Sequence, residues 1–233
     1  MLNFGFYNMD CMDGMKEFPD KFFDLAIVDP PYGIGVGSMA YTNGVKVVGK
    51  ALAKRTDYSG HAEWDQEPPK KEYFDELFRV SKKQIIWGGN YFANVLPVTK
   101  SWIVWDKRCD EKFSNDFADC ELAWCSNGVA RVYRYLYNGM LQGKMKDKEK
   151  RFHPTQKPVC LYEWLINRYA KPDDIILDTH VGSASSLIAC HNTRHKFVGF
   201  EIDKEYYEKA KQRLEAEQAQ MTIFDMGFNP YQE

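Results

Sequence analysis

The sequence predicts a doubly wound α/β fold with a mostly parallel sheet. Short apolar runs alternate with segments of helical spacing along all 233 residues, without an internal repeat or a low-complexity linker. In the C-terminal third, a strand, a glycine-containing turn, a helix and a second strand follow one another, and the two strands end in Asp178 and Glu201. The length suits one domain with a sizeable core, so we expect a single domain over residues 1–233.

In the N-terminal half, the clearest element is a short apolar strand that must stop at Asp29. Pro30 and Pro31 follow directly, and proline cannot continue a central strand because it lacks the amide hydrogen. The predicted elements of this half are a helix over 11–18, a strand over 24–29, a helix around 73–78, and strands over 84–87, 102–105 and 117–125.

The C-terminal part begins with a helix opened by Pro158, whose apolar face contains Leu161, Trp164, Leu165 and Tyr169. The elements predicted after it are a strand over 174–178, a helix rich in small residues over 182–190, a strand over 196–201 and a charged helix over 203–217.

Two segments lack sustained periodicity and are rich in basic residues. The first is predicted to be a long mobile loop over residues 33–62, and the second is the stretch 126–152. Between residues 129 and 151 there are seven basic side chains and two acidic ones. Charge alone is compatible with solvated loops or with contacts to nucleic-acid phosphates. The candidate residues for contacts with nucleic acid are Lys46, Lys50, Lys54, Arg55, Arg131, Arg134, Lys144 and Lys146.

Composition excludes several classes of protein. Hydrophobic residues make up 44% and charged residues 27%, and no apolar run is long enough to span a bilayer. The N-terminus has no basic and apolar signal pattern, so we expect a cytosolic protein. The six cysteines form no C-x-x-C pair and His153 has no partner at ligand spacing, so no metal site is expected.

The two strand-end acids indicate a nucleoside-type cofactor. Glu201 lies 23 residues after Asp178, and an acid at that position can accept hydrogen bonds from both ribose hydroxyls. The turn between them lacks G-x-G-x-x-G, and the chain contains no G-x-x-x-x-G-K-[ST] loop. A pyrophosphate-containing dinucleotide is therefore disfavoured.

Combined with this unit, Asp29-Pro30-Pro31-Tyr32 resembles the catalytic [DNS]-P-P-[YFW] motif of amino-group DNA methyltransferases. Residues 8–11 (Asn-Met-Asp-Cys) are similar to the G-D-C segment that precedes the first helix in the family. Residues 85–92 are similar to a segment that is common in its phage and prophage members. Residues 153–158 copy the H-P-[TA]-[QE]-K-P motif. The order of these motifs is that of the beta group, and the resemblance extends from about Leu2 to about Leu214.

The resemblance implies a sequence-permuted, Rossmann-like class I methyltransferase that uses S-adenosylmethionine and acts on DNA, with a short target-recognition region at 126–152. It assigns catalysis to Asp29, Pro30, Pro31 and Tyr32. It places the following residues at the cofactor: Asp10, Cys11, Asp29, His153, Thr155, Gln156, Lys157, Asp178, His180, Gly182, Ser183, Ser185, Glu201 and Ile202. In this scheme Asp10 reaches the adenine amine, although it can also simply cap a helix, and Lys157 can meet the cofactor's carboxylate.

The cofactor turn departs from the family's usual D-P-F-x-G-S-G. Thr179 replaces the proline, His180 the phenylalanine and Ala184 the last glycine, whereas Gly182 and Ser183 remain. The alanine could crowd the methionine moiety or be absorbed, and we interpret His180 as a packing replacement rather than a general base.

The chemistry follows from the motif residues. The exocyclic amine of adenine is a poor nucleophile because its lone pair is delocalised into the ring. If Asp29 and the Pro30 carbonyl accept its two hydrogens, the nitrogen becomes more tetrahedral and developing positive charge is stabilised. In-line methyl transfer then needs no covalent enzyme intermediate, and Tyr32 offers a ring on which the extruded base can stack.

We therefore predict methylation of adenine N6 in DNA, with three alternatives. Cytosine N4 is a similar amine, but the resemblance associates Ser at the first motif position with cytosine and Asp with adenine. A non-catalytic cofactor- or DNA-binding regulator of the same fold is the alternative from another class, motivated by the altered turn. RNA or a free nucleotide as substrate is a lesser possibility, because the recognition segment is short.

The tail, residues 218–233, contains a weak match to a partner motif. Residues 220–224 (Gln-Met-Thr-Ile-Phe) resemble the loose Q-x-x-[LI]-F peptide that engages the bacterial sliding clamp. Packing of Ile223 and Phe224 on the domain is the favoured interpretation. The sequence does not distinguish a monomer from a dimer.

Overall fold

The structure is a computed structural model that describes residues 1–35, 67–109, 118–138, 141–144, 146 and 148–225. Its helices are α1 (Cys11–Lys16), α2 (Lys71–Val80), α3 (Val159–Tyr169), α4 (Ser185–Asn192) and α5 (Lys204–Asp225). Its strands are β1 (Gly5–Asn8), β2 (Phe23–Val28), β3 (Ser81–Trp87), β4 (Trp102–Asp106), β5 (Cys120–Cys125), β6 (Arg131–Arg134), β7 (Tyr137–Asn138), β8 (Leu141–Gln142), β9 (Ile175–Asp178) and β10 (Lys196–Glu201).

The main sheet has the order β1-β10-β9-β2-β3-β5-β4-β6. The first five strands of this order are parallel, β5 is antiparallel to both its neighbours, and β6 is parallel to β4. From the centre of the sheet, the connection β9–α4–β10 leads towards the edge formed by β1, and the connection β2–α2–β3 leads towards the opposite edge. The switch point between β9 and β2 is where parallel α/β sheets place their ligands.

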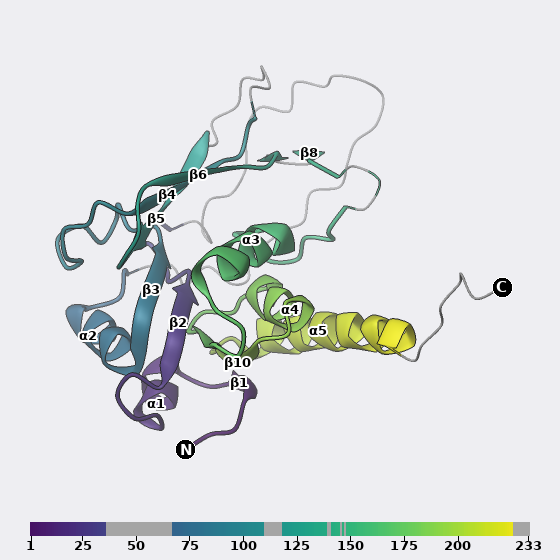
Figure 1. The fold of residues 1–233 in the computed structure, drawn as a ribbon, viewed down its shortest axis with the longest axis horizontal. Helices are drawn as coiled ribbons and strands as arrows, with labels where there is room; N and C mark the ends of the chain where they lie inside the picture. Colours follow the sequence, from purple (N-terminus) through teal and green to yellow (C-terminus); the bar gives the residue numbers. More distant parts are fainter. Residues whose placement is uncertain (36–66, 110–117, 139–140, 145, 147, 226–233) are drawn as a thin grey trace.

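Helices cover both faces of the sheet (Figure 1). Helices α1 and α2 pack on one face through side chains such as Met15, Phe74 and Leu77. Helices α3 and α4 pack on the opposite face through side chains such as Leu161 and Ala189, and α5 extends that layer along α4 and β1. This is the predicted doubly wound fold.

Local sequence explains where the key strand stops. The core strand β2 is buried at five of its six positions and ends at Val28, directly before Asp29 and the proline pair. Lys83 and Gln84 of β3 lie opposite Leu25 and Ala26. The proline pair therefore ends the strand as predicted, and Asp29 is left at its carboxyl end.

Two strands of the main sheet, β1 and β6, were not predicted from the sequence, and neither was the short pair β7-β8. Strand β1 is a short edge strand with partly exposed residues, and β6 begins and ends with arginine. Both lack the apolar alternation that predicts a strand, and they are fixed by pairing with β10 and β4. Because β6 belongs to the main sheet, the basic stretch 126–152 leaves the sheet only after Arg134. Helix α5 runs to Asp225, beyond the predicted end at 217 and through residues 220–224 of the tail.

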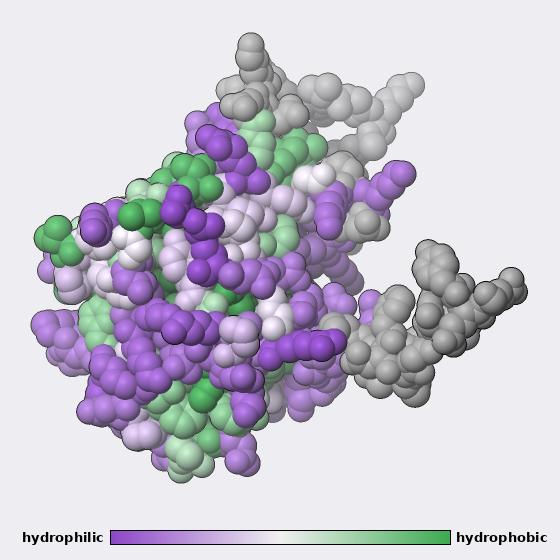
Figure 2. All heavy atoms as spheres, in the orientation of Figure 1, coloured by the Kyte–Doolittle hydropathy of each residue, from purple (hydrophilic) through white to green (hydrophobic). Residues whose placement is uncertain are grey.

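Among the described residues, no helix is both long enough and apolar enough to cross a membrane. Hydrophilic side chains predominate over α2 and α5 on the face shown in Figure 2, and the apolar ones form separate patches.

Candidate active site

The carboxyl ends of β2, β9, β10 and β1 bring the predicted site residues together. Parallel pairing places Asn8 beside Glu201 and Gly199 beside Asp178, while Ala26 pairs with Leu177. Asp10, Asp29, Asp178 and Glu201 therefore meet at one edge of the sheet although they are up to 191 residues apart in sequence.

Asp29 is held by two donors. The Tyr32 hydroxyl donates to Oδ1 at 2.5 Å, and the Lys157 ammonium forms a hydrogen-bonded ion pair with Oδ2. The Lys157 side chain is 3% exposed and that of Asp29 14%. Burial raises the pKa of Asp29 more than Lys157 lowers it. Burial opposes the charge on Lys157, but Asp29 and Glu121 raise its pKa, so it stays an ammonium.

The ring of Tyr32 lies between a glycine turn and a second aromatic ring. Tyr91, which is 46% exposed, stacks on Tyr32 with ring centroids 4.9 Å apart and an interplanar angle of 17°. Gly88 has φ +69°, and a Cβ there would lie 2.2 Å from the Tyr32 ring. Gly88 therefore supplies a backbone conformation and a space that other residues cannot. These two neighbours fix the orientation of the ring beside Asp29.

Glu121 and Lys107 complete the group around Asp29, and sequence reasoning missed both. Glu121 Oε2 lies 3.2 Å from Lys157 Nζ, and its Oε1 accepts a hydrogen bond of 2.9 Å from Lys107 Nζ. Burial disfavours the Glu121 carboxylate, but Lys157 and Lys107 outweigh this effect and lower its pKa. Neither residue belongs to a motif, and only the pairing of β4, β5 and β3 brings them to the site.

The cofactor turn fits an adenosine group. Gly182 adopts φ +55°, and its amide donates 2.9 Å to Glu201 Oε2, while Oε1 accepts from the Asp203 amide at 2.9 Å. Two backbone amides thus orient the carboxylate, and each oxygen keeps acceptor capacity for a ribose hydroxyl. A Cβ at Gly182 would lie 3.3 Å from the His153 ring, and Ile202 is 64% exposed beside Glu201. The residues present therefore fit S-adenosylmethionine.

The buried Asp178 carboxylate accepts hydrogen bonds from groups that follow it in the cofactor turn and in α4. It is 2% exposed, accepts from the His180 amide at 3.0 Å and accepts a short hydrogen bond from Ser186 Oγ. Burial raises its pKa to about 7, although these two hydrogen bonds oppose the rise. In this structure the Asp178 carboxylate contacts the turn's own groups.

The residues that depart from the family's motif are accommodated. Burial lowers the pKa of His180 to about 4, so the ring is neutral, and its Nδ1 lies 2.9 Å from Thr179 Oγ1. Tyr73 packs edge-on against the ring and bonds Thr179 Oγ1 at 2.6 Å. These contacts agree with a packing role for His180. Ala184, in place of glycine, is left-handed at φ +64°, which explains why glycine suits this position.

The hexapeptide motif divides into parts with different contacts. His153 packs against Tyr206 with ring centroids 4.4 Å apart, and its Nδ1 lies 3.2 Å from Thr155 Oγ1. Gln156 is buried and hydrogen-bonds the backbone of residues 150 and 152. Of the residues in this motif, only Lys157 reaches Asp29, to which it is hydrogen-bonded.

Asp10 caps helix α1. Its Oδ1 accepts from the amides of Met12 at 2.7 Å and Asp13 at 3.3 Å, which is the capping role weighed from the sequence. The neighbouring Cys11 Sγ lies 4.0 Å from His180 Nε2, and burial raises the pKa of this thiol to about 12. The preceding residue, Met9, donates its amide to the Glu201 carbonyl at 3.1 Å, so Asp10 follows at the carboxyl end of β1.

Arg213 of α5 links the cofactor turn to the recognition stretch. Its Nη1 donates to Ser183 O at 2.8 Å and to Ser185 Oγ at 2.9 Å, and its Nη2 pairs with Glu149 at 2.8 Å. The Ser183 and Ser185 hydroxyls are buried and lie 3.1 Å apart. These serines therefore hold the turn together, and the sequence did not single out Arg213 or Glu149.

Of the predicted DNA-contacting residues, the four that the structure describes do not share one surface. Lys46, Lys50, Lys54 and Arg55 lie outside the described residues. Lys144 and Lys146 are exposed. Because side chains alternate along a strand, Arg131 and Arg134 of β6 point to opposite faces of the sheet. Arg134 lies 3.5 Å from Asp106.

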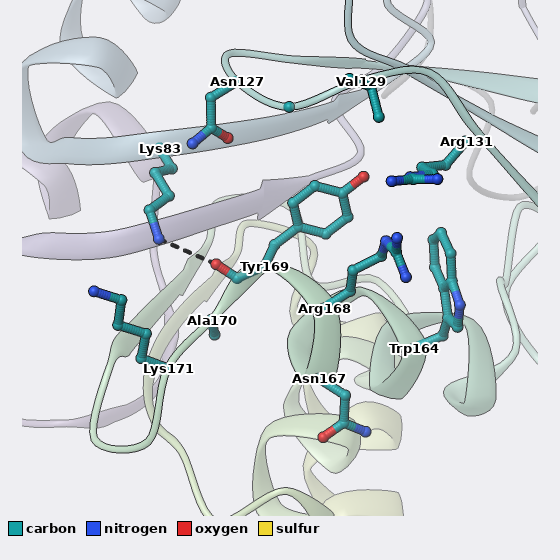
Figure 3. Close-up of a pocket in the computed structure, with 11 residues that line it drawn as sticks. Lys83, Asn127, Val129, Arg131, Trp164, Asn167, Arg168, Tyr169, Ala170 and Lys171 are labelled. Atoms are coloured by element: carbon teal, nitrogen blue, oxygen red, sulfur yellow. Dashed lines mark hydrogen bonds between the residues drawn. The ribbon is translucent and has the colours of Figure 1, made fainter.

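Arg131 lines a surface pocket of about 760 Å³ away from Asp29 (Figure 3). Lys83, Arg168 and Lys171 also line it, and Lys83 donates 3.1 Å to the Tyr169 carbonyl. The pocket lies near the amino ends of the parallel strands, whereas Asp29 is at a carboxyl end. It is therefore not part of the strand-end site. Within the described part of the chain, no group of histidine, cysteine or acidic residues could hold a metal ion.

A doubly wound sheet with the D-P-P-Y group and an adenosine-binding edge at its switch point defines a class I S-adenosylmethionine-dependent methyltransferase. The sequence profile of the DNA methylase family matches residues 97–212. The type II methyltransferase M.HpaI of Haemophilus parainfluenzae is 42% identical over 89% of this chain and 73% of its own length. The chain therefore belongs to the DNA methylase family, as the motifs predicted.

Two further comparisons agree with this assignment. The type II methyltransferase M.HinfI of Haemophilus influenzae is 26% identical over 88% of this chain, which spans 66% of that relative. The crystal structure of the M1.HpyAVI–SAM complex has the same fold, with a TM-score of 0.55 at 23% identity over 89% of this chain and 98% of the other. S-adenosylmethionine is the methyl donor of this class of enzyme.

Proposed function

We propose that this protein transfers a methyl group from S-adenosylmethionine to the N6 amine of adenine in DNA. The observation that carries the proposal is the Asp29 carboxylate, held by Tyr32 and Lys157 beside an exposed aromatic stack and next to the adenosine-binding edge. Family membership supports an amine in DNA as the acceptor, and aspartate at the first motif position favours adenine over cytosine. The proposal includes a cytoplasmic location in a bacterial or phage-infected cell.

The protein's own groups prepare the amine. Before the amine binds, the Tyr32 hydroxyl and the Lys157 ammonium fix the plane of the Asp29 carboxylate. This carboxylate can then accept one N6 hydrogen while the Pro30 carbonyl accepts the other. This arrangement moves the nitrogen lone pair out of conjugation and stabilises positive charge that develops on it. The methylated nitrogen is far more acidic than the amine, so Asp29 need not be a strong base to receive its proton.

The cofactor contributes an activated methyl group on a sulfonium centre when it is bound. Glu201 and the exposed Ile202 are proposed to hold its adenosine part, and the Gly182 turn its methionine part. The Thr155 and His153 pair lines the same turn. Together these groups set the direction of approach to the amine, and positioning supplies much of the rate.

The adenine must leave the duplex to reach Asp29. Tyr32, or the exposed Tyr91 ring that is stacked on it, is proposed to stack on the extruded base. Lys144, Lys146 and Arg134 are proposed to contact DNA phosphates, together with the basic loop 33–62. Arg131 points to the opposite face from Arg134, so it is the weakest member of the proposed DNA-contacting set.

The test is nucleoside mass spectrometry of unmethylated plasmid DNA after incubation with the protein and S-adenosylmethionine. N6-methyladenine is expected with the wild type and lost with Asp29→Ala. Asp75→Ala is the matched control, because Asp75 is an exposed acid in a surface pair with Lys71. N4-methylcytosine would overturn the base assignment, and cofactor binding without any modified base would favour the non-catalytic regulator or an RNA substrate.

A further inference from the structure

Four side chains of alternating charge form a row that ends at Asp29. Lys107 pairs with Glu121 Oε1 at 2.9 Å, Glu121 Oε2 lies 3.2 Å from Lys157, and Lys157 pairs with Asp29. Their side chains are 15%, 27%, 3% and 14% exposed in this order. Lys157 is the most buried of the four, and burying its ammonium costs free energy unless a carboxylate pairs with it.

The sheet register places Glu121 where it can serve this lysine. In β4 and β5, Trp105 pairs with Glu121, and Lys107 follows directly after β4. In β3 and β5, Trp87 pairs with Ala123, so Glu121 extends past the carboxyl end of β3. Because β3 is the neighbour of β2, this position lies beside Asp29.

The arrangement of donors creates a difficulty for the proposed reaction. Asp29 Oδ1 accepts from Tyr32 and Oδ2 from Lys157, so the target amine must share the carboxylate with two protein donors or replace one. If Lys157 simply lost Asp29, a buried ammonium would be left without a partner, which is strongly unfavourable. A second carboxylate within reach of Lys157 removes this cost.

We propose that Glu121 is a positioning residue for methyl transfer: it takes over the hydrogen bond of Lys157 when the target amine binds Asp29. The inference rests on the proposed function. No proton is transferred in this exchange, since Lys157 remains an ammonium and Glu121 remains a carboxylate. The amine N–H takes the place of the Lys157 N–H on Asp29 Oδ2, and Lys107 keeps Glu121 oriented from the other side.

The electrostatics of the neighbouring groups agree with this exchange. Lys157, Glu121 and Tyr32 face Asp29 directly, and Tyr73, Tyr162 and Asp178 lie close enough to interact with it electrostatically. Burial raises the pKa of Asp29 and the charge of Glu121 adds to the rise. The pKa of Glu121 itself is lowered, against burial, by Lys157 and Lys107. Glu121 is therefore ionised wherever Asp29 titrates.

Two substitutions should move the reaction in opposite directions. Glu121→Gln leaves Lys157 on Asp29 and removes a negative charge, so kcat should fall roughly 10- to 100-fold. The acid limb of kcat/KM for DNA, which reports Asp29 in the free enzyme, should move down by about one pH unit. Lys107→Met leaves the Glu121 charge less balanced, so the acid limb should move to higher pH.

The experiment is a pH profile of DNA methylation for wild type, Glu121→Gln and Lys107→Met, with Glu205→Gln as a matched exposed control that pairs with Lys209. Calorimetry with S-adenosylmethionine should give unchanged affinity for all four proteins, which also shows that they are folded. If Glu121→Gln fails to fold, Lys107→Met alone decides the question, through the direction in which the acid limb of its kcat/KM profile moves.

The inference is supported if the acid limb moves to lower pH in Glu121→Gln and to higher pH in Lys107→Met. A Glu121→Gln protein with the wild-type kcat and limb would overturn it, as would an equal loss of rate at every pH with an unmoved limb. An unmoved limb in Lys107→Met would overturn it as well. Wild-type protein that binds the cofactor but forms no N6-methyladenine would instead refute the proposed function, so the two failures are distinguishable.

Discussion

Replacing Asp178 by asparagine should change the pH dependence of stability in a defined way. Asp178 is 2% exposed, and burial raises its pKa from the ordinary 3.8 to about 7. A carboxyl whose folded-state pKa is raised contributes its full stability below the unfolded pKa and loses it as pH rises through the folded one. Wild-type protein should therefore lose stability between about pH 4 and pH 7, whereas Asp178→Asn does not ionise there.

The magnitude follows from the size of the shift. The rise from 3.8 to about 7 is about 3 pH units, and each unit corresponds to about 1.4 kcal/mol of unfolding free energy. The variant should thus gain up to about 4 kcal/mol relative to wild type between pH 4 and pH 7.5. A pH-independent cost of about 1 to 2 kcal/mol is superimposed, because the amide can accept from the His180 amide but not also from Ser186 Oγ.

Urea unfolding without cofactor at a series of pH values from 4.5 to 8.5 measures this difference. Asp24→Asn is the control: despite partial burial, Lys82 and the Ile175 amide lower the pKa of Asp24. Its stabilising contribution is complete above the unfolded pKa, so that variant should be less stable by a constant amount over the same range. A flat difference between wild type and Asp178→Asn from pH 5 to 7.5 would refute the reasoning.

Other substitutions test the site's geometry. Gly88→Ala should lower the unfolding free energy by about 1 to 3 kcal/mol and abolish most of the methylation activity, because φ is positive and the new Cβ would meet Tyr32. Retained activity would contradict this. Ala184→Gly should raise the unfolding free energy by up to about 1 kcal/mol in urea titrations by relieving the left-handed alanine, whereas a loss would show that its methyl group packs favourably. His180→Phe should keep calorimetric cofactor affinity close to wild type, since the neutral ring fills space, and a large loss would give the imidazole a direct role. Arg213→Met should weaken cofactor binding, because the turn loses two hydrogen bonds, and unchanged affinity would exclude this support.

Part of the candidate site could be predicted from the sequence, because some of its residues are tied to local signals. The proline pair had to end β2, which put Asp29 at a strand end, and the acid at Glu201 had the spacing of a second strand end. These rules depend on backbone chemistry within a few residues. They predicted the edge of the sheet at which the site would form.

The partners of Asp29 were decided by pairing between distant segments. Lys157 was assigned to the cofactor from its motif, but in the structure it contacts Asp29, which lies 128 residues away in sequence. Glu121 carried no signal at all, since a strand-end glutamate is common, and its role appears only when β5 pairs between β3 and β4. Edge strand β6 was missed for the same reason, because its sequence has no apolar alternation.

The sequence by itself therefore determined the fold class, the order of the motifs and the residue types that can hold a nucleoside and activate an amine. The tertiary structure decided which charges share a buried space: Lys157 with Asp29 and Glu121, and Arg213 with the cofactor turn and Glu149. The physical reason is that local propensity and proline or glycine chemistry act along the chain. The energy of a buried charge depends instead on whichever groups the sheet register brings within a few ångströms of it.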